Sequence, residues 1–314
     1  MKILVTGGAG FIGRWVVEKL LADDHEVYVL DNLSNGSLEN LVILQKHPCL
    51  KAVEIGDITD KKLLDNLFST VRFACCIHLA ASIHVHKSVQ DPQSAFNNNI
   101  LGTFYLLEAC RKWGTRMVFM STCHVYDQAV TGLITESHPT KPTSPYSGSK
   151  LAGEKLVLSY YHAYGLPVLI LRPFNTYGPC QKSDSEGGVV SIFMEAKLAG
   201  QPLTVHGDGT QTRDLVYVED CARLVTAAAY HGEINGEIIN GGTGRDIAIK
   251  ELAVIIAGEK GLVQIIPHVG PRSEVAKLLG GYQKAYNLLG WKPSTSLEEG
   301  LVRTEDWLKR EKGI

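Results

Sequence analysis

Two side chains four positions apart, Tyr146 and Lys150, could together carry out proton transfer. On a helix this spacing places them on one face, one turn apart. An ammonium beside a phenol favours the phenolate, so the tyrosine would act as a general acid or base nearer neutral pH. Such a pair is common and carries no function by itself, so its meaning depends on where the fold places it.

A second group of reactive side chains, Thr122, Cys123 and His124, follows a predicted strand at residues 116–120. The Thr122 hydroxyl could share a proton with Tyr146 and a substrate oxygen, or it could bond only to backbone. Cys123 is interpreted as a weak acid and His124 as a base, because an unperturbed histidine has a pKa of about 6.5. The plainer alternative makes Cys123 a small packing residue and leaves His124 to bond to substrate or backbone.

A glycine-rich turn links the first predicted strand, residues 2–6, to the first predicted helix, residues 11–21. Gly7 would allow a tight turn, Gly10 would let the backbone approach a diphosphate, and Gly13 would let the helix pack on the strand. The helix N-terminus then offers unpaired N–H groups and a favourable dipole to phosphate. This pattern in this context predicts a dinucleotide site, with a purely structural turn as the alternative.

Asp31 ends the second predicted strand, about 20 residues after the glycines. An acid there accepts hydrogen bonds from the adenosine ribose hydroxyls and repels a 2′-phosphate, so the expected cofactor is NAD rather than NADP. A solvated loop aspartate is the alternative. Asp57 and Ile58 follow the third predicted strand and could hold the adenine, but Asp57 could equally cap the helix that starts near Asp60.

Strand-like apolar runs alternate with helical patterns through the first half of the chain. Uninterrupted apolar strands separated by helices predict a doubly wound parallel sheet, the α/β Rossmann fold, with a smaller C-terminal substrate-binding cap. The expected domains are an NAD-binding domain at 1–172, with a returning segment near 215–240, and a substrate-binding domain formed by 173–214 and 241–314. The predicted strands are residues 2–6, 26–30, 51–55, 73–79, 116–120, 167–171, 203–206, 237–240 and 263–266, and the predicted helices are 11–21, 61–68, 100–113 and 146–164.

Composition and charge argue against several classes of protein, namely those that bind nucleic acid, span a membrane or depend on disulfides. The chain has 314 residues, 45% of them hydrophobic, and a net charge of −2 without a long run of like charges, so no nucleic-acid partner is expected. No apolar run could span a bilayer and no secretory signal is evident, so we expect a cytoplasmic protein without membrane contact. The seven cysteines form no Cys-x-x-Cys pair, which favours reduced thiols. His84 and His86 lack a third ligand at suitable spacing, so no metal is expected.

Several longer motifs resemble those of one enzyme family. They are VTGGAGFIG near the N-terminus, HLAAS at 78–82, the YxxxK pair, RPFNTYGP at 172–179 and GDGTQTRDLVYVED at 207–220. Over essentially its whole length the chain resembles the NAD-dependent nucleotide-sugar epimerases and dehydratases of the extended short-chain dehydrogenase/reductase family. The candidate cofactor-binding residues are then Gly7, Gly10, Phe11, Ile12, Gly13, Asp31, Asn32, Asp57, Ile58, Leu79, Ala80, Ala81, Tyr146 and Lys150.

The resemblance also implies a chemistry and a substrate site. Tyr146 would remove the proton of the sugar 4-hydroxyl while hydride passes from C4 to NAD, and the 4-keto group would acidify the C5–H. Thr122 would assist this proton transfer, and Lys150 would position the cofactor and tune Tyr146. The implied substrate contacts are Lys87, Asn175, Arg213 and Arg272, of which Arg272 could instead be a surface residue.

The chain departs from its apparent relatives after the threonine. Many 4-epimerases have small residues there and many 4,6-dehydratases have Thr-Asp-Glu, whereas the 5,6-dehydratase of the tunicamycin pathway is similar in having Thr-Cys-Glu. We expect a dehydratase or epimerase that acts on a UDP- or dTDP-hexose through a 4-keto intermediate, with elimination slightly favoured because His124 supplies a proton acceptor.

Three other functions stay open. They are a UDP-hexose 4-epimerase, a non-catalytic NAD-binding sensor or subunit, and a net oxidoreductase. Gly281 stands where many relatives have an acid, so the nucleotide base stays open as well. The resemblance further implies a homodimer through the helices at 100–113 and 146–164.

Overall fold

The first strand, β1 (Lys2–Thr6), sends its side chains alternately into two hydrophobic cores. Ile3 and Val5 belong to one cluster of buried side chains, and Leu4 belongs to the other. Because successive side chains of a strand point to opposite faces, a strand that is apolar throughout must be covered on both faces. The computed structural model describes residues 1–127, 132–183, 188–259, 261–267 and 276–314.

Seven strands form one sheet in which each neighbouring pair is parallel, in the order β11-β6-β5-β4-β1-β2-β3. The predicted doubly wound fold is therefore confirmed. The strand predicted at 73–79 is shorter, and most of the others end within two residues of the prediction. The remaining strands of the sheet are β2 (Glu26–Asp31), β3 (Leu50–Ile55), β4 (Cys75–His78), β5 (Arg116–Met120), β6 (Val168–Pro173) and β11 (Glu237–Gly241).

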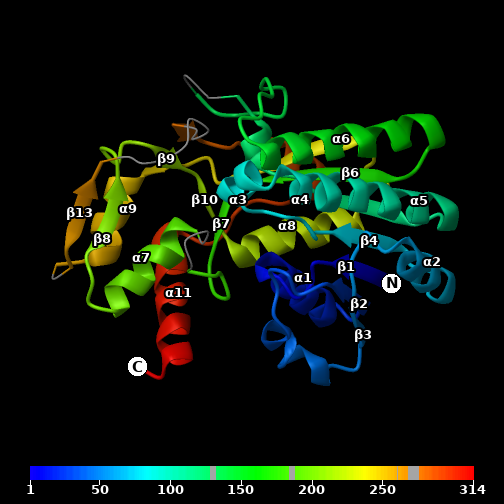
Figure 1. Ribbon diagram of the computed structural model, residues 1–314, viewed down its shortest axis with the longest axis horizontal. Coiled ribbons are helices and arrows are strands. Elements are labelled where there is room, and N and C mark those ends of the chain that lie inside the picture. Colours follow the sequence, from blue (N-terminus) through cyan, green and yellow to red (C-terminus); the bar gives the residue numbers. More distant parts are fainter. Residues whose placement is uncertain (128–131, 184–187, 260, 268–275) are drawn as a thin grey trace.

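Helices cover both faces of this sheet (Figure 1). On one face α1 (Phe11–Ala22) packs against α8 (Val218–Tyr230), and on the other α5 (Thr103–Trp113) packs against α2 (Lys61–Thr70) and α6 (Pro145–Tyr164). The helix predicted at 100–113 is regular only from Thr103, because Asn97–Gly102 forms a wider π-helical segment. Before it come α3 (Val85–Gln90) and α4 (Pro92–Phe96), and shorter 3-10 turns are formed by Leu38–Leu41, Leu44–Lys46 and Cys123–Val125.

A second group of elements, on the left in Figure 1, has its own buried cluster around α7 (Val189–Leu198) and α9 (Ile249–Ala257). Its strands form small sheets rather than extending the large one, and the strands predicted at 203–206 and 263–266 pair with each other here. The strands are β7 (Asn175–Tyr177), β8 (Leu203–His206), β9 (Thr212–Arg213), β10 (Leu215–Tyr217), β12 (Ile247–Ala248), β13 (Val263–Ile266) and β14 (Lys277–Leu278). The C-terminal helix α11 (Leu297–Lys312) packs against α7, whereas α10 (Gln283–Leu289) packs against β11 of the large sheet and against α8.

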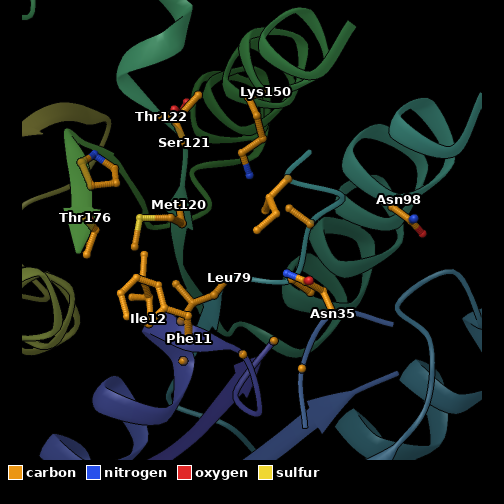
Figure 2. A pocket seen from close by; sticks show the side chains of 18 of the residues that line it. Phe11, Ile12, Asn35, Leu79, Asn98, Met120, Ser121, Thr122, Lys150 and Thr176 are labelled. Carbon is orange, nitrogen blue, oxygen red and sulfur yellow. The ribbon is translucent and has the colours of Figure 1, made fainter. Parts of the chain in front are cut away.

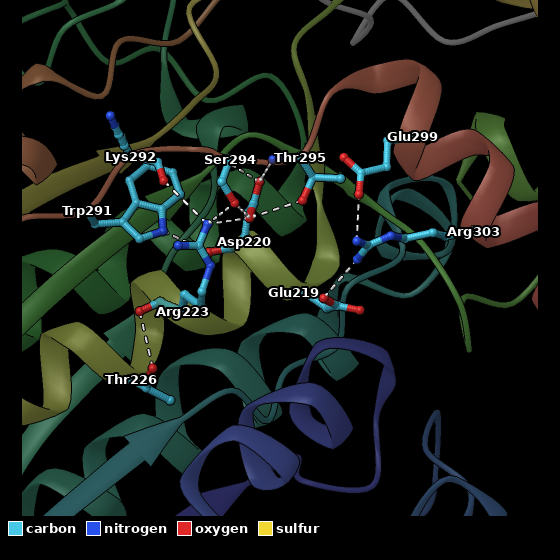
Figure 3. A network of polar contacts seen from close by, with 10 residues as sticks. All are labelled: Glu219, Asp220, Arg223, Thr226, Trp291, Lys292, Ser294, Thr295, Glu299 and Arg303. Carbon is cyan, nitrogen blue, oxygen red and sulfur yellow. Dashed lines mark hydrogen bonds and ion pairs between the residues drawn. The ribbon is translucent and has the colours of Figure 1, made fainter. Parts of the chain in front are cut away.

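One buried carboxylate, Asp220 in the first turn of α8, anchors the segment that leads to α11 (Figure 3). It accepts hydrogen bonds from the backbone N–H groups of Ser294 and Thr295, both at 2.9 Å. Arg223 pairs with the same carboxylate, and the Trp291 indole donates to the Asp220 carbonyl at 2.9 Å. The C-terminal helix is thereby tied to the helical layer that covers the sheet.

Within the described part of the chain, no helix has both the length and the apolar character needed to cross a bilayer.

Candidate active site

A cavity lies at the carboxyl ends of the strands, where ligands bind in open α/β sheets. Its walls come from the glycine turn after β1, the loops after β2 and β4, the end of β5, the start of α6 and the segment after β6. In Figure 2, Lys150 extends into the cavity from α6, across from Phe11 and Ile12 at the start of α1. The predicted residues that line it are Gly7, Gly10, Phe11, Ile12, Gly13, Asp31, Asn32, Ile58, Leu79, Ala80, Ala81, Thr122, Cys123, His124, Tyr146, Lys150 and Asn175.

The glycine turn leaves no room for side chains. Gly7 has a φ of +73°, and a Cβ there would lie 2.7 Å from the Ala80 nitrogen. A Cβ on Gly13 would lie 2.0 Å from the Gly7 carbonyl oxygen. Gly10 is the N-cap of α1, which has no side-chain cap, so the first N–H groups of the helix remain available to a ligand. This cradle fits the diphosphate of a dinucleotide.

Asp31 is buried beside this turn and helps to shape it. Its Oδ2 accepts from the Ala9 N–H at 2.9 Å, and its Oδ1 accepts from the Leu33 N–H at 2.9 Å. A carboxylate has about four acceptor positions, so further ones remain for ribose hydroxyls.

Asp57 does not line the cavity. Its Oδ2 accepts from the Asn32 side chain at 2.6 Å, and its Oδ1 accepts from the Thr59 N–H at 2.8 Å. Burial raises its pKa, but these hydrogen bonds outweigh burial and hold the pKa below the ordinary value. Asp57 therefore acts on the cavity through Asn32, while Asp60 caps α2. The adenine contact expected of Asp57 stays a prediction, because its neighbour Asn32 lines the cavity and a carboxylate has about four acceptor positions.

Thr122, Tyr146 and Lys150 converge on one wall of the cavity. Burial dominates and raises the pKa of Tyr146 to about 12, although the Thr122 hydroxyl lowers it. Burial also lowers the pKa of Lys150 to about 8, against the opposing charge of Glu154. Burial is thus the larger effect on the pKa of Tyr146, and it opposes the phenolate that the Lys150 ammonium was expected to favour.

Cys123 and His124 occupy the short turn after β5 and also line the cavity. Burial raises the pKa of the Cys123 thiol to about 12, so the thiol is protonated. Burial and then the Arg213 charge lower the pKa of His124 to about 4, so its imidazole is neutral at pH 7. The His124 ring approaches Tyr146 edge-on, with 6.5 Å between the ring centroids.

The predicted substrate contacts differ in where they lie relative to the cavity. Asn175 lines the cavity, and its buried Oδ1 has no hydrogen-bond partner among the described residues. Arg213 does not line it but is near enough to act on His124, while its Nη1 donates to the Thr212 carbonyl at 2.8 Å. Lys87 is exposed on α3 and does not line it. Arg272 lies outside the described residues.

The sequence interpretation missed several lining residues, notably Gln181, Asn98, Ser34 and Asn35. Gln181 donates from Nε2 to the Thr176 carbonyl at 3.1 Å, and its buried Oε1 has no partner in the part of the chain that the structure describes. The position of Gln181 directly after RPFNTYGPC could have drawn attention to it. No local pattern marks Asn98.

The described residues include no group of three His, Cys, Asp or Glu side chains placed to hold a metal ion.

Comparison with known proteins agrees with this geometry. The family model described as GDP-mannose 4,6 dehydratase matches residues 4–304. A putative UDP-glucose 4-epimerase from Methanocaldococcus jannaschii is 40% identical over 311 residues, which is 98% of this chain and 98% of that protein. The solved structure of Pal from Bacillus thuringiensis is 55% identical and has a TM-score of 0.97, with 99% of this chain and 100% of that chain covered.

A further solved structure extends the comparison to dehydratases. DesIV from Streptomyces venezuelae, a dTDP-glucose 4,6-dehydratase with NAD and TYD bound, is 33% identical and has a TM-score of 0.92, covering 100% of this chain and 98% of that chain. Likeness in sequence and likeness in structure thus point to one group of enzymes. The chain belongs to the NAD-dependent nucleotide-sugar epimerases and dehydratases of the extended short-chain dehydrogenase/reductase family.

Proposed function

We propose that this enzyme is an NAD-dependent dehydratase of a UDP- or dTDP-hexose that works through a transient 4-keto sugar. The observation that carries the proposal is a neutral histidine, His124, buried in the cavity wall beside Tyr146. A 4-epimerase needs no base at this position, whereas an elimination must remove a proton from carbon.

The first step is oxidation at C4 of the sugar. NAD, when bound, supplies the hydride acceptor, and its fit rests on the glycine cradle and on Asp31. Thr122 and Tyr146 line the same cavity and would take the proton of the 4-hydroxyl. Lys150, with a pKa of about 8, is mostly an ammonium at pH 7 and stabilises the phenolate as it forms.

The second step is elimination. The 4-keto group acidifies the C5–H, and His124 takes that proton as a base. The C5–H electron pair forms a double bond to C6 while the 6-hydroxyl leaves, and the protonated Cys123 thiol can donate the proton that makes the leaving group water. The hydride's return to the sugar would restore NAD.

Turnover in deuterated water tests the proposal. Purified enzyme is mixed with UDP- and dTDP-hexoses, and products are followed by mass spectrometry and NMR. Elimination lowers the product mass by one water and exchanges the C5 proton. Tyr146→Phe should abolish turnover, and His124→Ala should abolish elimination. His86→Ala, a histidine exposed on α3, serves as the matched control. Unchanged elimination in His124→Ala would contradict the base role.

The second candidate is a UDP-hexose 4-epimerase, favoured by the 40% identity to the Methanocaldococcus jannaschii protein. In the same assay it would give a product of unchanged mass without deuterium on carbon. Steady accumulation of NADH would indicate a net oxidoreductase. The absence of turnover on every nucleotide sugar would support a sensor or assembly subunit, although both Tyr146 and Lys150 are present.

A homodimer through α5 and α6 is also proposed. Phe104 on α5 is 37% exposed and Phe96 on the adjoining α4 is 51% exposed. A second copy would cover this apolar surface. Light scattering on the purified protein should give twice the mass of the chain.

A further inference from the structure

A buried ion pair lies behind the reaction residues. Glu154 on α6 has no exposed surface, and Arg172 on β6 is 2% exposed. The guanidinium donates from Nε to Oε1 at 2.8 Å and from Nη2 to Oε2 at 2.5 Å. Ser121 donates from its hydroxyl to the same Oε1. The carboxylate therefore joins two neighbouring strands, β5 and β6, to one helix.

Stability alone gives a poor reason for such a pair. Removing two charges from water costs several kcal/mol per ion, and replacing a buried pair by apolar residues is often neutral or stabilising. The position of the pair is more informative. Glu154 follows Lys150 by one helical turn and Tyr146 by two, so it lies on the same helix face. Ser121 directly precedes Thr122.

We propose that Glu154 is a positioning residue that holds Lys150 as an ammonium toward the cavity and fixes the Thr122 strand end against α6. The inference rests on the proposed function insofar as Lys150 serves the reaction, but its effect on Lys150 can be measured without substrate. The charge of Glu154 would act on Lys150, and the hydrogen bond from Ser121 would act on the neighbouring Thr122.

The other described titratable side chains that face Lys150 are uncharged, so Glu154 is the charge that acts on the pKa of Lys150. His78, on β4, lies between the Thr6 and Thr103 hydroxyls at 2.8 Å and 3.0 Å, and burial lowers its pKa to about 3, so it is neutral. Phe119 presents its ring 4.6 Å from the Lys150 Nζ. Tyr146 is protonated, with a pKa of about 12.

On the far side of the pair, Arg172 also lies 4.6 Å from the ring of Tyr126, whose pKa burial raises to about 12. Tyr126 is therefore uncharged at neutral pH. If Glu154 lost its charge, Lys150 would keep its burial and would gain an unpaired Arg172 as a neighbour. Both effects disfavour the ammonium.

The test compares Glu154→Gln, the double variant Glu154→Gln with Arg172→Met, and Asp220→Asn. Asp220 is a matched control, because it is another buried carboxylate that holds an arginine and backbone N–H groups outside the cavity. Protein with 13C at the lysine Cε is titrated by NMR, with Lys150→Arg identifying the Lys150 signal. The urea midpoint and the pH profile of kcat/KM are measured in parallel.

We expect the Lys150 midpoint of Glu154→Gln to fall below its wild-type value near 8. The alkaline limb of kcat/KM should move to lower pH by the same amount. At a fixed pH above that limb, kcat/KM should fall about tenfold for each pH unit of the move. The double variant should recover its urea midpoint but only part of the Lys150 midpoint, because it removes the unpaired Arg172 and still lacks the Glu154 charge. Asp220→Asn should lower the urea midpoint only.

The proposal is overturned if Glu154→Gln lowers the urea midpoint as Asp220→Asn does but leaves the Lys150 titration unchanged. A wild-type enzyme that turns over no UDP- or dTDP-hexose would contradict the proposed function. The NMR titration would still decide whether Glu154 controls Lys150.

Discussion

Gly13→Ala is expected to remove most of the affinity for NAD. A Cβ at position 13 would lie 2.0 Å from the Gly7 carbonyl oxygen, whereas real Cβ contacts are essentially never under 3.0 Å. The carbonyl must therefore move by about 1 Å, in a turn already fixed by the φ of +73° at Gly7. A misplacement of about 1 Å at a site of this kind costs on the order of 100-fold, which is about 2.8 kcal/mol of binding energy.

The assay is a fluorescence titration of nucleotide-free protein with NADH, together with thermal unfolding at increasing NAD. NAD should raise the melting temperature of the wild type, because a ligand bound only by the native state stabilises it, and should raise that of Gly13→Ala far less. Gly148→Ala is the control. Gly148 lies inside α6 and its Cβ would meet nothing within 4 Å. It should bind NADH normally and gain about 0.5–1 kcal/mol of stability. An affinity of Gly13→Ala within threefold of wild type would refute the steric reasoning.

Three further outcomes are expected. Asp220→Ala should lower the free energy of unfolding at pH 7 by about 2–4 kcal/mol, measured by urea unfolding, because it leaves two backbone N–H groups without their acceptor. Burial raises the pKa of Asp220, but its hydrogen bonds and Arg223 lower it more, so the folded value is below 3.8. Its contribution to stability should be complete above that pH and lost as the pH falls through the folded value, a dependence absent from Asp220→Asn. His124 has a pKa of about 4, so the pH profile of kcat/KM in the free enzyme should show an acid limb near 4; a limb at 6.5 would contradict the buried environment. Phe104→Glu should shift the light-scattering mass toward one chain, and an unchanged mass would place the dimer contact elsewhere.

The parts of the site that follow from local chain geometry could be predicted from the sequence. The glycine turn, Asp31, and the pair Tyr146 and Lys150 each depend on a strand that ends and a helix that begins next to it. In a parallel sheet these junctions lie at the same edge. The strand order therefore places Thr122 at the same cavity as Tyr146 and Lys150.

The parts that depend on burial or on distant segments could not be predicted in the same way. The pKa of Tyr146 reflects desolvation by the whole cavity wall, and spacing along one helix cannot report that. Gln181 reaches the cavity only because the chain after β7 folds back over it. Lys87 was placed near the sugar by resemblance, but the short helix α3 leaves it exposed. Asp57 also bonds to Asn32 and Thr59, and these bonds between side chains and backbone of two loops could not be predicted from the local sequence.

A late segment of the chain completes the large sheet, and this affects folding during synthesis on the ribosome. β6 pairs with β11, which is synthesised only after β7 to β10, and α8 covers a face of the sheet that α1 alone leaves open. A nascent chain that has emerged only as far as residue 172 therefore exposes an unpaired strand edge and an uncovered apolar face. Stable folding on the ribosome must wait for Glu237–Gly241, and a gene fragment that ends before this strand should yield aggregated protein.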